Sequence, residues 1–198
     1  MIHTVVFDLG EVLASPPSLY EDLGRVIGAI PRDVAAQYWQ ERDSYDDGAT
    51  DEDYWGGLLT RLRISPERSA ISRLAELDAR LWTELRSTAR QLLLDVHGTG
   101  VGVAVLSNAP HSVQAAADSA PWRGDIDHLF VSATLGLMKP DPALYRLVEQ
   151  RLGIEGAEIA FVDDKPANVE AASQLGWRTH TWVSDADTRV WLVGLGVL

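Results

Sequence analysis

Three short apolar runs, each of which stops abruptly at a polar residue, constrain the fold of this 198-residue chain most strongly. Each run is followed by a carboxylate or a hydroxyl: VVF by Asp8, VAVL by Ser107, and FV by Asp163 and Asp164. Continuous runs rich in β-branched residues are typical of strands that are buried on both faces of a parallel sheet. Because ligands bind at the carboxyl ends of such strands, we expect these polar side chains to meet at one functional edge.

The order of the predicted elements indicates how the chain is divided. After Gly100, strand-like runs alternate with helix-like segments, which is typical of right-handed βαβ units. From Leu19 to Leu94, apolar residues instead recur at spacings of three and four, which predicts helices throughout. The sequence therefore predicts an α/β fold in which residues 1–15 and 95–198 form a doubly wound, Rossmann-like parallel sheet. A small helical cap, residues 16–94, is inserted after the first strand.

Prolines mark where the predicted helices of the second half begin. Pro110, Pro142 and Pro166 fall near first helical positions, where proline costs little because that N–H has no helical partner. Two of these helix starts lie beside Asn108 and Asp164. The free N–H groups and positive dipole end of a helix attract anions. The pattern therefore indicates an anion site at this edge of the sheet.

Composition excludes several classes of protein. The formal net charge of −12 argues against a nucleic-acid partner, because phosphate backbones require clustered lysine and arginine. The absence of cysteine excludes disulfides, thiolate zinc sites and cysteine nucleophiles. The first residues, MIHTVVFDLG, lack a basic leader, and their apolar run is too short for a signal peptide or a membrane span. We expect a cytoplasmic protein without a membrane partner, either a monomer or a homodimer.

Four motifs in this order, FDLGEVL, VLSN, GLMKPDP and DDKPANVEAASQLG, resemble those of the haloacid dehalogenase superfamily. Within it, they are most similar to the branch of α-D-glucose-1-phosphate phosphatase and the N-terminal phosphatase domain of epoxide hydrolase. The resemblance implies hydrolysis of a small phosphorylated metabolite through an aspartyl phosphate on Asp8, the nucleophile. It implies that Lys139 balances the charge of nucleophile and phosphate, and that Ser107 and Asn108 bind phosphoryl oxygens.

The resemblance also implies a Mg²⁺ site. Asp8, Asp164 and the main-chain carbonyl of Gly10 would be ligands, with Asp163 nearby, because Mg²⁺ prefers hard oxygen donors. The two adjacent aspartates also fit the start of a helix, and both roles can hold at once.

The first motif departs from the superfamily pattern at one position. Most of its phosphatases carry a second aspartate two residues after the nucleophile, where this chain has Gly10. That aspartate protonates the leaving oxygen and later activates water, so its loss costs about 10² to 10⁴ in rate if nothing replaces it. Three explanations are compatible with Gly10. The glucose-1-phosphate branch shares the Asp-x-Gly pattern and consists of phosphatases. A substrate with an acidic leaving group needs less protonation by the enzyme, and Glu11 or a cap residue could replace the missing aspartate.

Two alternative functions follow from the same residues. One is a catalytically impaired homologue that binds a phosphorylated metabolite or a protein partner, as Gly10 suggests. The other is haloacid dehalogenation, which is disfavoured because dehalogenases need no metal and lack the paired aspartates that this chain retains.

The predicted cap supplies candidate specificity residues. Trp39, Arg42, Tyr45 and Asp46 recur at helical spacings of three and four, so they can share one face. We expect Arg42 and Tyr45 to contact a sugar or another small polar metabolite, with packing between cap helices as the alternative. For the tryptophans, packing is the favoured interpretation. A cap of this size would exclude water from the site and admit small substrates when it opens.

Overall fold

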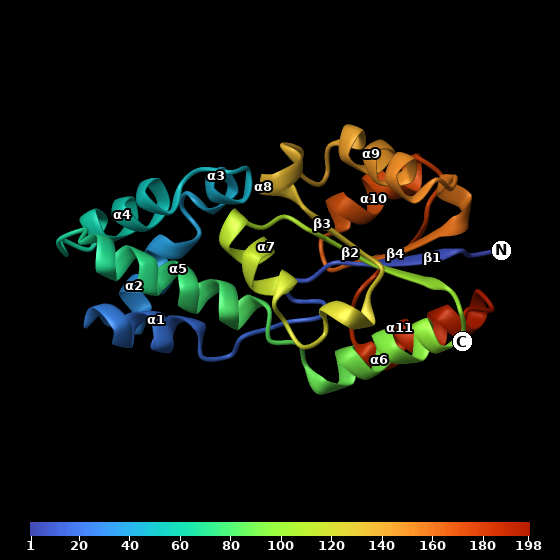
Figure 1. Ribbon diagram of the computed structural model, residues 1–198, viewed down its shortest axis with the longest axis horizontal. Coiled ribbons are helices and arrows are strands. Elements are labelled where there is room, and N and C mark those ends of the chain that lie inside the picture. Colours follow the sequence, from blue (N-terminus) through green and yellow to red (C-terminus); the bar gives the residue numbers. More distant parts are fainter.

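A single parallel sheet organises the protein, whose computed structural model describes residues 1–198 (Figure 1). Its five strands are ordered β3-β2-β1-β4-β5. They are β1 (Thr4–Phe7), β2 (Gly102–Ser107), β3 (His128–Val131), β4 (Ile159–Asp163) and β5 (Arg178–Thr181). All neighbouring pairs are parallel, which confirms the predicted α/β class.

The first strand occupies the centre of the sheet because its residues are apolar on both faces. Thr4 pairs with Gly102 on one side and with Ile159 on the other. Successive side chains of a strand point to opposite faces. Accordingly, Val5 and Phe7 belong to one apolar cluster and Val6 to another, and all three are fully buried.

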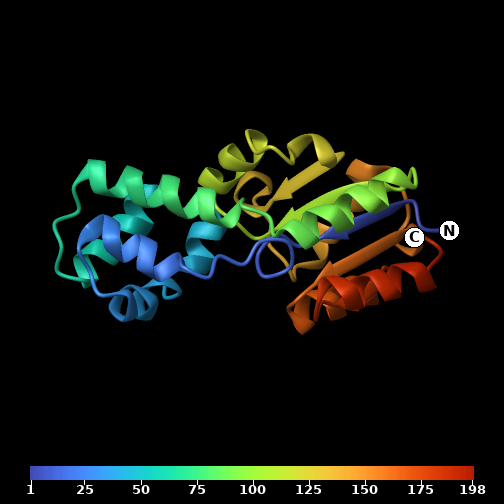
Figure 2. The same ribbon diagram turned by 90° about the horizontal axis from the view of Figure 1, so that it is seen from below.

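Helices cover both faces of this sheet. One face packs against α6 (Ser87–Gly98), α7 (His111–Asp118) and α11 (Asp185–Gly194). The other packs against α9 (Pro142–Leu152) and α10 (Pro166–Gln174). The connections contain the short helix α8 (Ser132–Leu135) and the 3-10 turns η1 (Arg123–Asp125) and η2 (Gly156–Glu158). The two views in Figures 1 and 2 show this doubly wound arrangement, with both termini at the amino ends of the strands.

Five helices between β1 and β2 form a separate layer beyond the carboxyl ends of the strands (Figures 1 and 2). They are α1 (Leu19–Ile27), α2 (Pro31–Tyr38), α3 (Arg42–Asp46), α4 (Asp51–Arg61) and α5 (Arg68–Trp82). We call this layer the cap. Its core is aromatic: Tyr45 stacks on Tyr54 with ring centroids 4.3 Å apart, and Trp55 is fully buried beside them.

One boundary differs from the sequence-based expectation. Helix α6 packs on β2 and α11, not on the other helices of the predicted cap. The chain therefore returns to the sheet between Trp82 and Ser87, ahead of the expected junction between residues 94 and 95. An amphipathic pattern shows that a helix buries one face, but it does not show against which layer.

Helix starts follow the sequence signals. Pro142 and Pro166 occupy the first positions of α9 and α10, and the Asp141 side chain accepts a hydrogen bond from the Ala143 N–H at 2.8 Å. Pro110 immediately precedes α7 as its cap residue. None of the helices is both long and apolar enough to cross a membrane.

Candidate active site

The carboxylate of Asp8 lies at the point where β1 ends. Its backbone N–H still donates to Val162 O at 2.9 Å, so the residue is held in line with the sheet. The Leu9 N–H donates to Asp8 Oδ1 at 2.7 Å. The chain then turns sharply, with Glu11 in the left-handed region at φ 58°, a conformation rare for a residue other than glycine. Asp8 is only 7% exposed, yet it lines a cavity.

A buried lysine links two strands at this edge. Lys139 Nζ lies 2.8 Å from Asp8 Oδ1 and 2.7 Å from Asp163 Oδ2, and it donates to Leu106 O at 2.9 Å. Its backbone is held by the side chain of Asn108, which accepts from the Lys139 N–H and donates to the Lys139 carbonyl, both at 2.8 Å. Asn108, which follows β2, therefore positions the loop that carries the lysine.

The two aspartates at the end of β4, Asp163 as its last residue and Asp164 just after it, have different surroundings. Asp163 is fully buried and accepts from Lys139 Nζ, from the Lys165 N–H at 2.8 Å and from Asn168 Nδ2 at 2.9 Å. Asp164 is half-buried, lines the cavity and pairs with no other side chain. One oxygen each of Asp8, Asp163 and Asp164 lie within 4.8 Å of one another. Three carboxylates at this separation suit a cation that prefers hard oxygen ligands.

Burial and charge shift the pKa values of these groups. Burial raises the pKa of Asp8 to about 7, against the lowering effect of Lys139 and with a further increase from Asp163. Burial likewise raises the pKa of Asp164, and the neighbouring Asp163 charge adds to this. Although burial by itself lowers the pKa of Lys139, Asp8 and Asp163 together raise it above its usual value. The lysine is therefore charged, while the carboxylates repel one another.

A cavity opens between the sheet edge and the cap. From the core, it is lined by residues that the sequence singled out: Asp8, Gly10, Ser107, Asn108, Lys139 and Asp164. The cap contributes Trp39, Arg42, Asp46 and Trp82. The structure thus brings residues of four motifs and the cap to one place, as expected for the carboxyl edge of an open α/β sheet.

Two of the predicted site residues do not reach this cavity. Asp163 lies beneath it and holds Lys139, as described above. Tyr45, expected to contact substrate, is packed inside the cap, where its hydroxyl donates to Asp51 Oδ1 at 2.5 Å and lies 3.1 Å from Ser112 Oγ. The helical spacing placed Tyr45 near Arg42 correctly, but its ring is stacked on Tyr54 instead of facing the cavity.

Arg42 lies in the cavity wall within a buried ionic network. Its Nε donates to Asp46 Oδ1 at 2.7 Å, and its Nη1 lies 3.2 Å from Asp78 Oδ2. Its Nη1 also donates to the Tyr38 hydroxyl, which in turn donates to Asp78 Oδ1 at 2.5 Å. The indole N–H of Trp82 donates to the same hydroxyl at 2.8 Å. This network fixes the orientation of the cap side chains that face the sheet.

Sequence reasoning missed several residues of the cavity wall. Trp82, Trp39 and Lys165 line it, although packing was the favoured interpretation for Trp39 and the other two were not proposed as site residues. One signal was available for Lys165. The chain has only two lysines among its 17 basic residues, and both line this cavity. A lysine is a compact point charge, and a planar arginine fork does not reproduce it.

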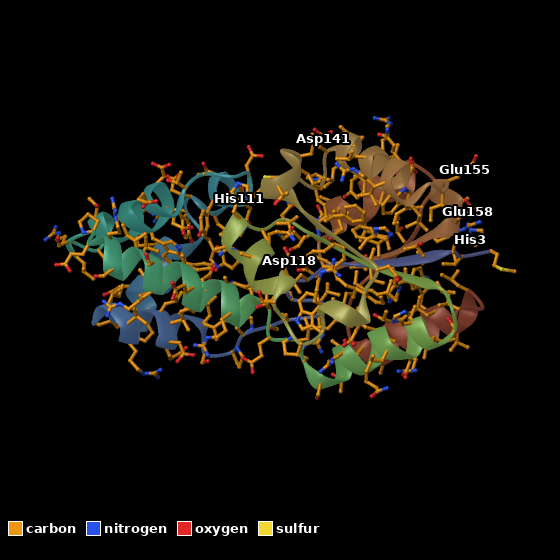
Figure 3. All side chains as sticks on the ribbon, viewed as in Figure 1. His3, His111, Asp118, Asp141, Glu155 and Glu158 are labelled. Atoms are coloured by element: carbon orange, nitrogen blue, oxygen red, sulfur yellow. The ribbon has the colours of Figure 1, made fainter.

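The five histidines of the chain take no part in this site, since none of them lines the cavity. Figure 3 places His3 beside Glu158 at the far end of the sheet, where the two pair at 3.2 Å, and His111 at the start of α7. His180 pairs with Asp187 at 2.8 Å.

Fold and site together define an α/β protein in which an acidic cavity at the end of a parallel sheet is covered by an inserted helical cap. The family model described as "Hydrolase: haloacid dehalogenase-like hydrolase" matches residues 2–176. The chain belongs to this family.

Sequence relatives include members with different reactions. The chain is 26% identical over 186 residues to the (S)-2-haloacid dehalogenase of Pseudomonas sp. strain YL, covering 92% of this chain and 80% of the relative. It is 27% identical over 196 residues to the phosphatase MT3486 of Mycobacterium tuberculosis, covering 95% of this chain and 90% of the relative. Identity is nearly equal in the two cases, so the reaction has to be argued from the site.

Solved structures of the family share the fold. The L-2-haloacid dehalogenase of Xanthobacter autotrophicus with chloropropionic acid covalently bound superposes with a TM-score of 0.77 at 23% identity, covering 100% of this chain and 85% of that one. The HAD family enzyme bt-2542 of Bacteroides thetaiotaomicron, in complex with magnesium and inorganic phosphate, gives a TM-score of 0.69 at 19% identity, covering 91% and 94%.

Proposed function

We propose that this hydrolase cleaves small phosphate monoesters in a Mg²⁺-dependent reaction, with Asp8 as the nucleophile. The observation that carries the proposal is the cluster of Asp8, Asp163 and Asp164, whose oxygens lie within 4.8 Å while a single buried lysine provides the compensating charge. One lysine leaves this buried site with an excess of negative charge. A divalent cation would remove that excess and allow a phosphate dianion to enter.

The donors present fit Mg²⁺. Asp164 has no competing partner, and the Gly10 carbonyl accepts no backbone hydrogen bond, so both oxygens are free to be ligands together with Asp8. Asp163 is occupied by Lys139 and Asn168 and acts from beneath the site. When bound, Mg²⁺ supplies charge stabilisation to the phosphoryl oxygens.

The groups of the chain itself account for substrate binding and attack. Asp8 Oδ1 is held by Leu9 and Lys139, whereas Oδ2 has no hydrogen-bond partner and is free to attack phosphorus. The Ser107 hydroxyl and the Asn108 backbone N–H have no partner in the chain and line the cavity, so they can donate to phosphoryl oxygens. The resulting aspartyl phosphate splits one difficult displacement into two easier ones.

Similarity to the phosphatase MT3486 and to the complex of bt-2542 with magnesium and phosphate supports this function. Haloacid dehalogenation is the competing function, supported by the similarity to the Pseudomonas enzyme. It also requires an aspartate nucleophile, but it gives no role to Asp164, a desolvated carboxylate without a side-chain partner. The acidic cluster therefore favours the phosphatase.

The test measures both reactions on the same preparation. Phosphate release is followed for a panel of sugar phosphates, nucleoside monophosphates and p-nitrophenyl phosphate, and halide release for 2-haloacids, each with Mg²⁺ or EDTA. We expect phosphate release that EDTA and Asp8→Asn both abolish. Halide release that persists in EDTA, together with an inactive phosphate panel, would replace the phosphatase with a dehalogenase.

A further inference from the structure

The proposed reaction lacks a proton donor in the loop that carries the nucleophile. Gly10 has no side chain, and a Cβ built there would lie 3.5 Å from a ring carbon of Trp82, so the indole occupies the adjacent space. Glu11 borders the cavity, but it is exposed, and its Oε2 accepts from the Ser15 hydroxyl at 2.7 Å. Neither position supplies a buried carboxylic acid. Leaving an alkoxide unprotonated is costly in phosphate ester hydrolysis.

The cap supplies the missing group at Asp46, the last residue of α3. Asp46 lines the same cavity as Asp8 and is only 7% exposed. One of its oxygens, Oδ1, accepts from Arg42 Nε at 2.7 Å, whereas Oδ2 has no hydrogen-bond partner in the chain. Its backbone contacts the core, because the Ser132 hydroxyl donates to the Asp46 carbonyl at 2.5 Å.

Asp46 is not needed to neutralise Arg42. The guanidinium has a second carboxylate, Asp78, whose Oδ2 lies 3.2 Å from Nη1 and which is fully buried. Arg42 also donates to the Tyr38 hydroxyl. An arginine between two carboxylates holds both in place, but only one is required for charge balance. The other, which faces the cavity, is available for chemistry.

We propose that Asp46 is the general acid and base of the reaction, in place of the carboxylate that is missing at position 10. This inference depends on the proposed phosphatase function. In the first step Asp8 Oδ2 bonds to phosphorus, the bond from phosphorus to the ester oxygen breaks, and that oxygen takes the proton of Asp46. In the second step water bonds to phosphorus, its proton passes to Asp46, and the Asp8–phosphorus bond breaks. Inorganic phosphate leaves and Asp46 is protonated again.

The electrostatic surroundings suit both steps. Burial raises the pKa of Asp46 to about 6, against the lowering effect of Arg42 on its own helix. Asp78 on α5 raises it further, and Lys165 from the core lowers it. A general acid and base works best when its pKa lies near the operating pH, since both protonation states are then populated.

The experiment compares Asp46→Asn with wild type in single-turnover reactions on two esters. One is p-nitrophenyl phosphate, whose leaving group needs no proton, and the other is the fastest alkyl phosphate of the panel. The amide keeps the shape of the side chain and can still accept from Arg42. Asp47→Asn, an exposed neighbour outside the cavity, is the matched control. The quenched enzyme is also assayed for the phosphoryl group on Asp8.

We expect Asp46→Asn to slow release of the alkyl alcohol by about 10²- to 10⁴-fold, whereas the first burst of nitrophenol stays within about tenfold of wild type. The phosphoryl group then accumulates on Asp8, because its hydrolysis lacks a base. A purely structural role would slow both esters equally and would not accumulate the intermediate, and that result overturns the proposal.

Two further outcomes separate the two proposals. If wild type hydrolyses p-nitrophenyl phosphate but no alkyl ester, the enzyme has no proton donor for the leaving group. That result refutes the role of Asp46 and leaves the proposed phosphatase function intact. Wild type inactive on every ester refutes the phosphatase and, with it, the role of Asp46.

Discussion

Replacing Lys139 with methionine tests the electrostatic design of the site. The lysine is 4% exposed, and its ammonium group lies within 2.9 Å of Asp8, Asp163 and the Leu106 carbonyl. Methionine preserves much of the volume but leaves two buried carboxylates without their shared cation. Removing one partner of a buried ion pair typically costs about 3–5 kcal/mol of folding stability. We expect a loss of this size near pH 8.

The loss depends on pH with a defined sign. A carboxyl whose pKa is higher in the folded than in the unfolded protein loses stability as the pH rises through the folded value. In wild type Asp8 already has a pKa of about 7, from burial, and Lys139 lowers it. Lys139→Met removes that lowering effect, so the pKa of Asp8 rises further. The penalty is therefore larger at about pH 8 than at about pH 5, where Asp8 binds a proton.

Urea unfolding of wild type and variant at the two pH values measures this loss. Lys165→Met is the matched control, since it removes the only other lysine, which is exposed and forms no ion pair. We expect this control to change the free energy of unfolding by no more than about 0.5 kcal/mol. Adding Asp8→Asn to Lys139→Met removes one of the stranded charges and recovers part of the loss. A Lys139→Met penalty equal to that of the control, or independent of pH, would refute the reasoning.

Three further predictions concern the acidic cluster and the cap. Burial raises the pKa of Asp46 from 3.8 to about 6, so this carboxyl lowers the free energy of unfolding by about 3 kcal/mol as the pH rises through that window. Asp46→Asn should abolish this pH dependence. An equal pH dependence of the unfolding free energy in wild type and variant would contradict the prediction. Asp164→Asn removes the carboxylate of the cluster that pairs with no other side chain. Titration calorimetry should show that Mg²⁺ binding is lost, while the unfolding free energy is retained. Unchanged Mg²⁺ binding would exclude Asp164 as a ligand. Tyr38→Phe removes a hydroxyl that bonds to Asp78, to Arg42 Nη1 and to the Trp82 indole N–H, and it should cost about 1–3 kcal/mol in unfolding experiments. A neutral change would show that water replaces the hydroxyl.

The strands and their functional ends could be predicted because the signals are local. An apolar run followed by a carboxylate, as at Asp8, identifies both the strand and its functional end. Neighbouring parallel strands then bring such ends together without further information. The structure accordingly places Asp8, Ser107, Lys139 and Asp164 around one cavity.

The parts that could not be predicted depend on contacts between distant segments. Trp82 fills the space beside Gly10, although the two are far apart in the sequence, and no periodicity shows this. Helical spacing groups Arg42 with Tyr45, but it does not show whether either side chain faces the cavity. That depends on how α4 packs, because the Tyr45 ring stacks on Tyr54 of α4 inside the cap. Adjacent aspartates look alike in sequence, and only burial separates Asp163 from its neighbour.

The central claim, an aspartyl phosphate on Asp8, is tested most directly by locating the phosphoryl group during turnover. The enzyme is mixed with a hydrolysed ester and Mg²⁺, quenched in acid and digested, and the peptides are analysed by mass spectrometry. We predict a phosphoryl group on the peptide that contains Asp8, lost in EDTA and in Asp8→Asn. Steady phosphate release without any phosphoryl group on Asp8 at any quench time, or release that survives Asp8→Asn, would contradict the account.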